Sequence, residues 1–173
     1  MSILSLRDRC LAIQMLVLDV DGVLTAGGIV HGNAGMELKT FHVRDGSGLK
    51  IWHASGKRTA LVTGRRSTAV EVRATELGIA LVVQGASDKL AAFHDVLARA
   101  GVSAQATCCI GDDVPDVRPS SHCGLAVAVA DACFEARATA HYITQAPGGR
   151  GAVREVIELV LRCQGAWPRV ATS

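Results

Sequence analysis

Short runs of β-favouring apolar residues alternate with helical patterns along this chain, and this alternation restricts the fold more than any other feature. The apolar runs lie at 15–18, 59–62, 79–83, 107–110, 125–129 and 141–144. Helical patterns, three of them closely followed by a glycine, lie at 46–54, 66–77, 88–100 and 151–163. The alternation predicts an α/β fold, with an open, doubly wound, mostly parallel (Rossmann-like) sheet and helices on both faces.

Residues 26–43 interrupt this alternation. They contain glycines, Asn33 and two short extended runs, which predict a β-hairpin inserted between the first strand and the first helix. The chain has 173 residues, of which 49% are hydrophobic and 20% charged, as expected for one globular domain. We expect that domain to span residues 1–164 and to be followed by a flexible tail at 165–173.

The charge pattern disfavours nucleic acid as a partner. The net charge is +2, the 18 basic residues are scattered among 16 acidic ones, and aromatic residues make up only 3% of the chain. Such a surface lacks both a basic block for phosphates and aromatic rings on which bases stack.

The cysteines and the N-terminal residues indicate a cytoplasmic protein. The six cysteines include no CxxC pair, and several lie in apolar segments, where buried, reduced thiols are expected. Acids and Gln interrupt the apolar residues at the N-terminus, which does not resemble a signal peptide. No apolar run approaches the ~20 residues that a membrane span requires.

The stretch LVLDVDGVLT places Asp19 and Asp21 at the end of the first apolar run. A strand buried on both faces should exclude Asp19 unless this acid lies at the strand end. These ten residues alone are equally consistent with acids that only end a strand and shape a loop. The residues that follow the other predicted strands are therefore needed to distinguish these two interpretations.

Polar residues also follow three of the other runs. They are Thr63, Gly64, Arg65 and Arg66; then Gln84, Gly85, Asp88 and Lys89; then Gly111, Asp112, Asp113 and Asp116. Ligands of a doubly wound sheet bind outside the carboxyl ends of its strands, so these groups should meet at one edge. Carboxylates that converge repel one another unless a cation compensates, and oxygen ligands favour Mg²⁺.

Four of these segments together resemble the motifs of the haloacid dehalogenase superfamily of phosphotransferases. They are DVDGVLT, VTGR, the DK at a helix start, and GDDVPD. The resemblance implies that Asp19 is the nucleophile that forms an aspartyl-phosphate, and that Asp21 is the general acid and base. It also implies that Thr63 and Lys89 hold the phosphoryl oxygens.

The same resemblance implies a magnesium site. Its ligands would be the Asp19 side chain, the backbone carbonyl of Asp21 and the Asp112 side chain. Asp113 and Asp116 would support the site by orienting metal-bound waters and Lys89.

The spacing of the motifs leaves no room for the cap domain that most members of this superfamily carry. Asp19 and Thr63 are 44 positions apart, and Thr63 and Lys89 are 26 apart. The segments FHVRDGSGLK, VVQGASDKLAAF and GGRGAVREV resemble a capless branch, over about residues 10–164. Members of this branch form homo-oligomers, and the resemblance implies a tetramer in which the hairpin covers a neighbouring site.

The resemblance to this branch implies hydrolysis of 3-deoxy-D-manno-octulosonate 8-phosphate in lipopolysaccharide precursor synthesis. A nonulosonate 9-phosphate is the alternative substrate, and Ser47 and Val83 stand where relatives often have aromatic residues. A keto acid substrate needs a cation for its carboxylate. Arg65, beside Gly64 in the second motif, is the first candidate, followed by Arg66 and Arg44.

Other function classes fit the sequence less well. GGRGAVRE is not a complete dinucleotide-binding fingerprint, the histidines lack zinc-ligand spacing, and no serine lies in a nucleophile elbow. A non-catalytic receiver-like domain with a phosphorylated Asp remains an alternative. Asp21 separates the two, because a receiver needs no acid two residues after its phosphorylated Asp.

Overall fold

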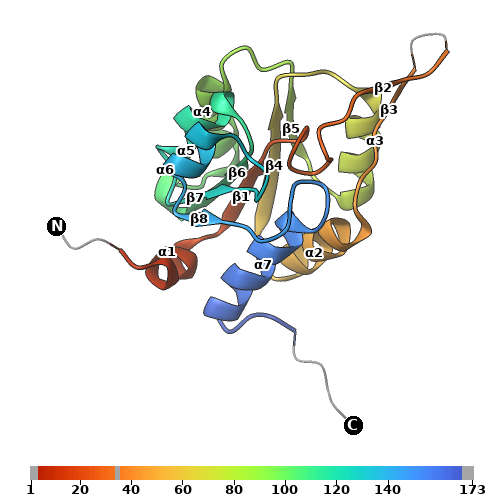
Figure 1. The fold of residues 1–173 in the computed structure, drawn as a ribbon. Coiled ribbons are helices and arrows are strands. Elements are labelled where there is room, and N and C mark those ends of the chain that lie inside the picture. The colour runs from red at the N-terminus through yellow and green to blue at the C-terminus, as the bar shows by residue number, and fades with distance from the viewer. Residues whose placement is uncertain (1–3, 34–35, 169–173) are drawn as a thin grey trace.

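A computed structural model describes residues 4–33 and 36–168 of the chain, and its centre is one parallel sheet (Figure 1). Within these residues the sheet has six strands in the order β5-β4-β1-β6-β7-β8. The strands are β1 (Met15–Leu18), β4 (Arg58–Thr63), β5 (Leu81–Gln84), β6 (Thr107–Gly111), β7 (Leu125–Ala128) and β8 (Tyr142–Ile143). The chain runs outward from β1 in both directions, so the strand order reverses between β1 and β6. The predicted doubly wound parallel sheet is confirmed.

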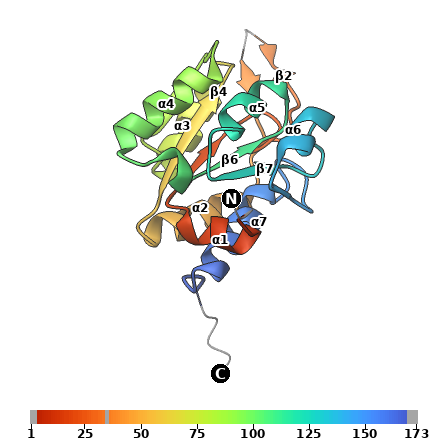
Figure 2. The ribbon, with the colours of Figure 1, turned by 90° about the vertical axis from the view of Figure 1, so that its left-hand side faces the viewer.

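Helices cover both faces of this sheet. They are α1 (Leu6–Ala12), α2 (Val43–Ala54), α3 (Thr68–Leu77), α4 (Lys89–Ala100), α5 (Val114–Ser120), α6 (Phe134–Thr139) and α7 (Ala152–Cys163), with a 3₁₀ turn at Ala104–Ala106. Figure 2 shows α1, α2 and α7 gathered below the sheet. The sequence patterns predicted α2, α3, α4 and α7 but not the three short helices.

Alternating side chains of the strands build two cores. On β1, Leu16 and Leu18 pack with α1, α2, α3 and α7, whereas Met15 and Val17 pack with α4. All four residues are buried. Because β1 is covered on both faces, the polar groups that follow it can only lie beyond its carboxyl end.

The predicted hairpin is present as β2 (Val30–His31) and β3 (Glu37–Leu38), which pair antiparallel (Figure 1). The ladder is two residues long, and the hairpin extends away from the sheet next to α3. Within residues 4–33 and 36–168 no separate cap domain follows it, as the motif spacing predicted.

The strand predicted at 79–83 begins two residues later than expected. Gly78 takes a left-handed conformation after α3, and the N–H of Ile79 donates to Ala74 O over 2.9 Å. Ile79 is therefore the apolar residue that closes the end of a helix, and not the first residue of β5. A run of apolar letters cannot distinguish these two roles.

The tail expected at 165–173 lies partly outside the described residues, because 169–173 are not described. Its first part contacts the fold. The N–H groups of Ala166 and Trp167 both donate to Leu161 O. The guanidinium of Arg154 lies over the Trp167 ring, with its Cζ 4.7 Å from the ring centroid.

Two further features of the described residues bear on the sequence predictions. The six cysteines are free, and Cys10, Cys108, Cys109 and Cys123 are buried. None of the described helices is both long enough and apolar enough to cross a bilayer.

Candidate active site

The turn after β1 presents Asp19 and Asp21 at the edge of the sheet. The N–H of Asp19 donates to Ile110 O over 3.1 Å, which extends the ladder between β1 and β6 by one residue. The chain then turns sharply at Gly22, whose φ is +91°. Glycine is needed there for a second reason, since a Cβ would collide with the carboxylate of Asp112. The sharp turn thus lets Asp112 approach the loop that carries both acids.

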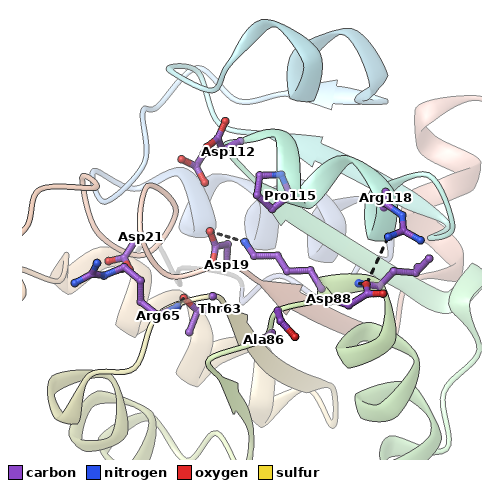
Figure 3. Close-up of a pocket in the computed structure, with 14 residues that line it drawn as sticks. Asp19, Asp21, Thr63, Arg65, Ala86, Asp88, Asp112, Pro115 and Arg118 are labelled. Carbon is purple, nitrogen blue, oxygen red and sulfur yellow. Dashed lines mark hydrogen bonds and ion pairs between the residues drawn. The ribbon is translucent and has the colours of Figure 1, made fainter.

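Thr63 and Lys89 reach the same edge from β4 and from the start of α4. Thr63 ends β4 and is buried, and its carbonyl accepts the N–H of Ala86 over 3.0 Å. Asp88 caps α4 by accepting the N–H groups of Leu90 and Ala91, which fixes the first turn of the helix that carries Lys89. The Lys89 ammonium lies 2.9 Å from Asp19 Oδ2, the contact marked by the dashed line at Asp19 in Figure 3. It also lies 2.7 Å from Asp116 Oδ1.

The acids after β6 are arranged by the first turn of α5. Asp113 caps this helix, and the Asp116 side chain accepts the N–H groups of Asp112 and Asp113. Gly111 has no Cβ, which leaves the space that the Asp116 carboxylate occupies. As a result, one carboxylate oxygen from each of Asp19, Asp112 and Asp116 lies within 4.8 Å of the others.

The converging acids strongly perturb one another. Burial, with the nearby Asp116, raises the pKa of Asp19 to about 6 even though Lys89 opposes the rise. Burial, with the charges of Asp19 and Asp116, raises the pKa of Asp112 to about 7. Burial alone would lower the pKa of Lys89, but Asp116 and Asp19 outweigh it and the pKa is raised. The cluster therefore carries more negative charge than Lys89 can balance.

The donor set fits a hard divalent cation such as Mg²⁺. The Oδ1 atoms of Asp19 and Asp112 are buried and have no hydrogen-bond partner among the described residues. Asp116, by contrast, is already bonded to Lys89 and to two backbone N–H groups. Two buried carboxylate oxygens without a partner, in a cluster with an excess of negative charge, suit an oxygen-liganded metal. The assignment of the Asp21 carbonyl as a third ligand stays a prediction.

A cavity of about 390 Å³ opens over these residues (Figure 3). The predicted site residues that line it are Asp19, Asp21, Thr63, Gly64, Arg65, Lys89, Asp112 and Asp113. Arg44 and Arg66 are exposed and do not line it, and Asp116 lies beneath it. Among the predicted arginines, Arg65 is thus the one that the fold brings to the cavity.

Two charged residues of the hairpin, Glu37 and Lys39, reach the site although they belong to none of the predicted motifs. The Lys39 ammonium bonds Asp21 Oδ1, and Glu37 bonds both Lys39 and Arg65. A signal was available, because Glu37 and Lys39 flank Leu38 in an extended segment, where residues two apart point to the same side. Arg118 and Asp88, which also line the cavity, form a looser pair at 3.7 Å.

Comparison with known proteins gives concordant results at three levels. A family model described as haloacid dehalogenase-like hydrolase matches residues 68–157. The 3-deoxy-D-manno-octulosonate 8-phosphate phosphatase KdsC of Yersinia pestis is 47% identical over 156 residues, which are 90% of this chain and 83% of the relative. Its counterpart in Escherichia coli K12 is 46% identical over 153 residues, 88% and 81% of the two chains.

Solved structures show the same similarity in three dimensions. The crystal structure of the Yersinia pestis phosphatase matches with a TM-score of 0.91 and 46% identity, over 92% of this chain and 86% of that one. The phosphatase of Moraxella catarrhalis, crystallised with magnesium, phosphate and a KDO molecule, matches with a TM-score of 0.89 and 40% identity, over 92% and 91%.

Proposed function

Because this chain belongs to the haloacid dehalogenase-like hydrolases, we propose that it is a Mg²⁺-dependent phosphatase that hydrolyses 3-deoxy-D-manno-octulosonate 8-phosphate to the free keto sugar acid and phosphate. In this role it would act in lipopolysaccharide precursor synthesis. The observation that carries the proposal is the meeting of Asp19 and Asp112, each with an unpartnered buried oxygen, beside Lys89 and Thr63.

The chemistry uses the chain's own residues in two steps. In the first, an Asp19 carboxylate oxygen attacks phosphorus in line while Asp21 gives its proton to the departing alkoxide, which leaves an aspartyl-phosphate. In the second, Asp21 takes a proton from water, and the resulting nucleophile releases phosphate from Asp19. Splitting the hydrolysis in this way replaces one difficult displacement with two easier ones.

Lys89, Thr63 and the metal stabilise charge in both steps. The Lys89 ammonium holds Asp19 in position and, with the Thr63 hydroxyl, contacts the phosphoryl oxygens. The Asp19 and Asp112 side chains and the Asp21 carbonyl would hold Mg²⁺, which when bound would supply Lewis-acid stabilisation of the phosphoryl group. Asp113 and Asp116 support the site, Asp116 through its 2.7 Å contact with Lys89.

We assign the substrate carboxylate to Arg65. Its side chain is 43% exposed, and it lines the cavity beside Gly64. A guanidinium group can bind both oxygens of a carboxylate at once. Arg66 and Arg44 are exposed outside the cavity, so in this proposal they would act only if a second subunit rearranged or completed the site.

We also propose that the protein is a homotetramer of the cytoplasm. The hairpin carries exposed apolar side chains at Ile29, Val30, Met36 and Leu38, between 49% and 56% exposed. Such a patch on a short hairpin suits contact with another copy, which would cover the open cavity. Free cysteines suit a reducing compartment. Sedimentation as a monomer at assay concentrations would contradict the tetramer.

The central experiment measures phosphate release with Mg²⁺ from eight-carbon and nine-carbon keto acid phosphates. We expect the higher kcat/KM for 3-deoxy-D-manno-octulosonate 8-phosphate, since the ratio of kcat/KM values reports differential transition-state binding. A higher kcat/KM for a nonulosonate 9-phosphate would change the assigned substrate but not the proposed reaction mechanism.

Variants of Asp19 separate an enzyme from a receiver-like domain. Asp19→Asn should abolish turnover, while Asp95→Asn, which changes an exposed acid on α4, should leave it unchanged. Robust turnover by Asp19→Asn would overturn the covalent mechanism. A native chain that takes up phosphate on Asp19 and retains it for many minutes would favour the receiver-like alternative.

A further inference from the structure

Four charged side chains form a closed ring at the mouth of the cavity. Lys39 bonds Asp21 Oδ1 and lies 3.0 Å from Glu37 Oε1. Arg65 Nη2 lies 2.8 Å from Glu37 Oε2, and Arg65 Nε lies 3.7 Å from Asp21 Oδ2. Both oxygens of Asp21 therefore face a cation, and Glu37 joins the two cations on the other side of the ring.

Lys39 is the most enclosed member of this ring. Its side chain is 1% exposed, compared with 18% for Asp21 and 15% for Glu37. Lysine is rarely buried to this extent unless its charge is paired. The Lys39 ammonium bonds Asp21 and lies 3.0 Å from Glu37 Oε1, so its charge is paired with two carboxylates. Lys39 is thus a fixed, charged contact and not a solvated surface side chain.

The hairpin and Asp21 depend on each other for their positions. The hairpin ladder has only the pairs Val30 with Leu38 and His31 with Glu37, and an isolated two-stranded hairpin of this kind is marginal in water. Asp21 lies in a turn, and among the described residues Lys39 and Arg65 are its side-chain partners. The ring is consequently the connection through which the hairpin can orient this acid.

We propose that Lys39, held by Glu37, is a positioning residue that fixes the Asp21 carboxylate for proton transfer to the leaving group. Lys39 anchors Oδ1, so Oδ2, which has only the looser 3.7 Å contact with Arg65 Nε, is the oxygen that holds and transfers the proton. In the first step, a bond forms between an Asp19 oxygen and phosphorus, the bond from phosphorus to the alkoxide oxygen breaks, and the Asp21 proton moves to that oxygen. Glu37 pairs with both Lys39 and Arg65 and so offsets one of the two positive charges that face Asp21.

This inference rests on the proposed function, because it assumes that Asp21 is the general acid. The alternative role for the ring is a clamp that only fixes the hairpin against the sheet. The two roles differ in one measurable respect. A misplaced Asp21 lowers kcat/KM, which reports the first step, only for substrates whose leaving group needs a proton, whereas a loosened fold lowers kcat/KM for all substrates alike.

The test uses phenyl phosphates whose leaving groups range from phenolate to p-nitrophenolate. These substrates have similar shape and lack the sugar and its carboxylate. For Lys39→Met we expect kcat/KM to fall about 10- to 100-fold on phenyl phosphate but less than about 3-fold on p-nitrophenyl phosphate, because nitrophenolate departs without protonation. Glu37→Gln should also make kcat/KM depend more strongly on the pKa of the leaving group, but by a smaller factor than Lys39→Met. Lys50→Met, at an exposed lysine of α2, is the matched control and should match the native chain.

Each outcome of this test either supports or overturns the positioning role of Lys39. An equal loss across the series, or a loss confined to the sugar acid phosphate, would overturn the positioning role, since the first indicates a clamp and the second a direct substrate contact. If Lys39→Met fails to fold, Glu37→Gln becomes the test. An unchanged dependence of its kcat/KM on leaving-group pKa would then overturn the inference. If the native chain hydrolyses phosphate esters but not the eight-carbon sugar phosphate, only the assigned substrate is wrong. If it hydrolyses no phosphate monoester, the proposed function falls and this inference with it.

Discussion

Asp112→Asn should make the metal-free protein more stable while removing its response to Mg²⁺. Asp112 is partly buried, its Oδ1 has no described partner, and burial with the charges of Asp19 and Asp116 raises its pKa from 3.8 to about 7. An increase of this size corresponds to about 4 kcal/mol of unfavourable free energy in the ionised folded state. Because the side chain is partly exposed, solvent screens much of this, and we expect the variant to gain about 1–2 kcal/mol at pH 8.

The sign of the pH dependence follows from the same shift. A carboxyl whose folded pKa is raised contributes stability below its unfolded pKa and loses it as the pH rises through the folded value. For Asp112 that loss lies between pH 3.8 and about 7. The advantage of the variant should thus be largest at pH 8 and should shrink at pH 5. Chemical unfolding in EDTA at both pH values measures it.

Adding Mg²⁺ should reverse the order of the two proteins. At a concentration of about one hundred times its dissociation constant, a ligand that binds only the folded state adds about 2.7 kcal/mol, which exceeds the gain expected for the variant. The native chain should show this gain, and Asp112→Asn should not. Asp95→Asn is the control, because Asp95 is an exposed acid of α4 that does not line the cavity. A variant that is less stable than the native chain in EDTA, or one still stabilised by Mg²⁺, would refute the reasoning.

Other changes test the remaining parts of the site. Lys89→Met leaves the buried carboxylates of Asp19 and Asp116 without their cation, so we expect a loss of about 3–5 kcal/mol in metal-free urea unfolding at pH 8, against little change for Lys50→Met. Gly22→Ala should abolish turnover, because the added Cβ collides with the Asp112 carboxylate in a left-handed turn; near-native activity would contradict this close approach. Removal of Mg²⁺ with EDTA should abolish phosphate release and lower the Tm, and both should return when Mg²⁺ is restored.

The edge of the sheet where the acids meet was predictable from sequence because strand ends are easily read in a parallel sheet. Asp19 and Asp112 follow apolar runs that pair directly, Leu18 with Ile110, so the spatial proximity of the two acids follows from strand order. Motif order then restricts which strand ends are neighbours. The predicted helices likewise carry long apolar periodicities that end at glycines such as Gly101.

The elements that the sequence did not predict are either short helices or contacts between residues far apart in the chain. Helix α5 contains Pro119 and has seven residues, which is too short for a periodic pattern, and its position is fixed instead by the Asp113 and Asp116 capping box. The ring around Asp21 joins residues 18 and 28 positions apart across a hairpin with a two-residue ladder. No local propensity determines such contacts, because their geometry exists only after the hairpin has packed against the sheet.

An open site without a cap must still hold its catalytic turn rigid, and a loop from the other end of the chain provides that support. Gly149 N–H donates to Val23 O over 2.8 Å, and Gly148 approaches the Gly22 carbonyl so closely that a Cβ would collide with it. Asp131 accepts the Gly148 N–H, and Glu155 accepts the N–H groups of the residues that precede this loop. The turn that carries Asp21 is therefore held from behind by backbone contacts with a glycine loop and from the front by the Lys39 side chain. Because the glycine loop contacts only the backbone of the turn, the side chains of Asp19 and Asp21 still line the cavity, which explains how the site can be both open and ordered.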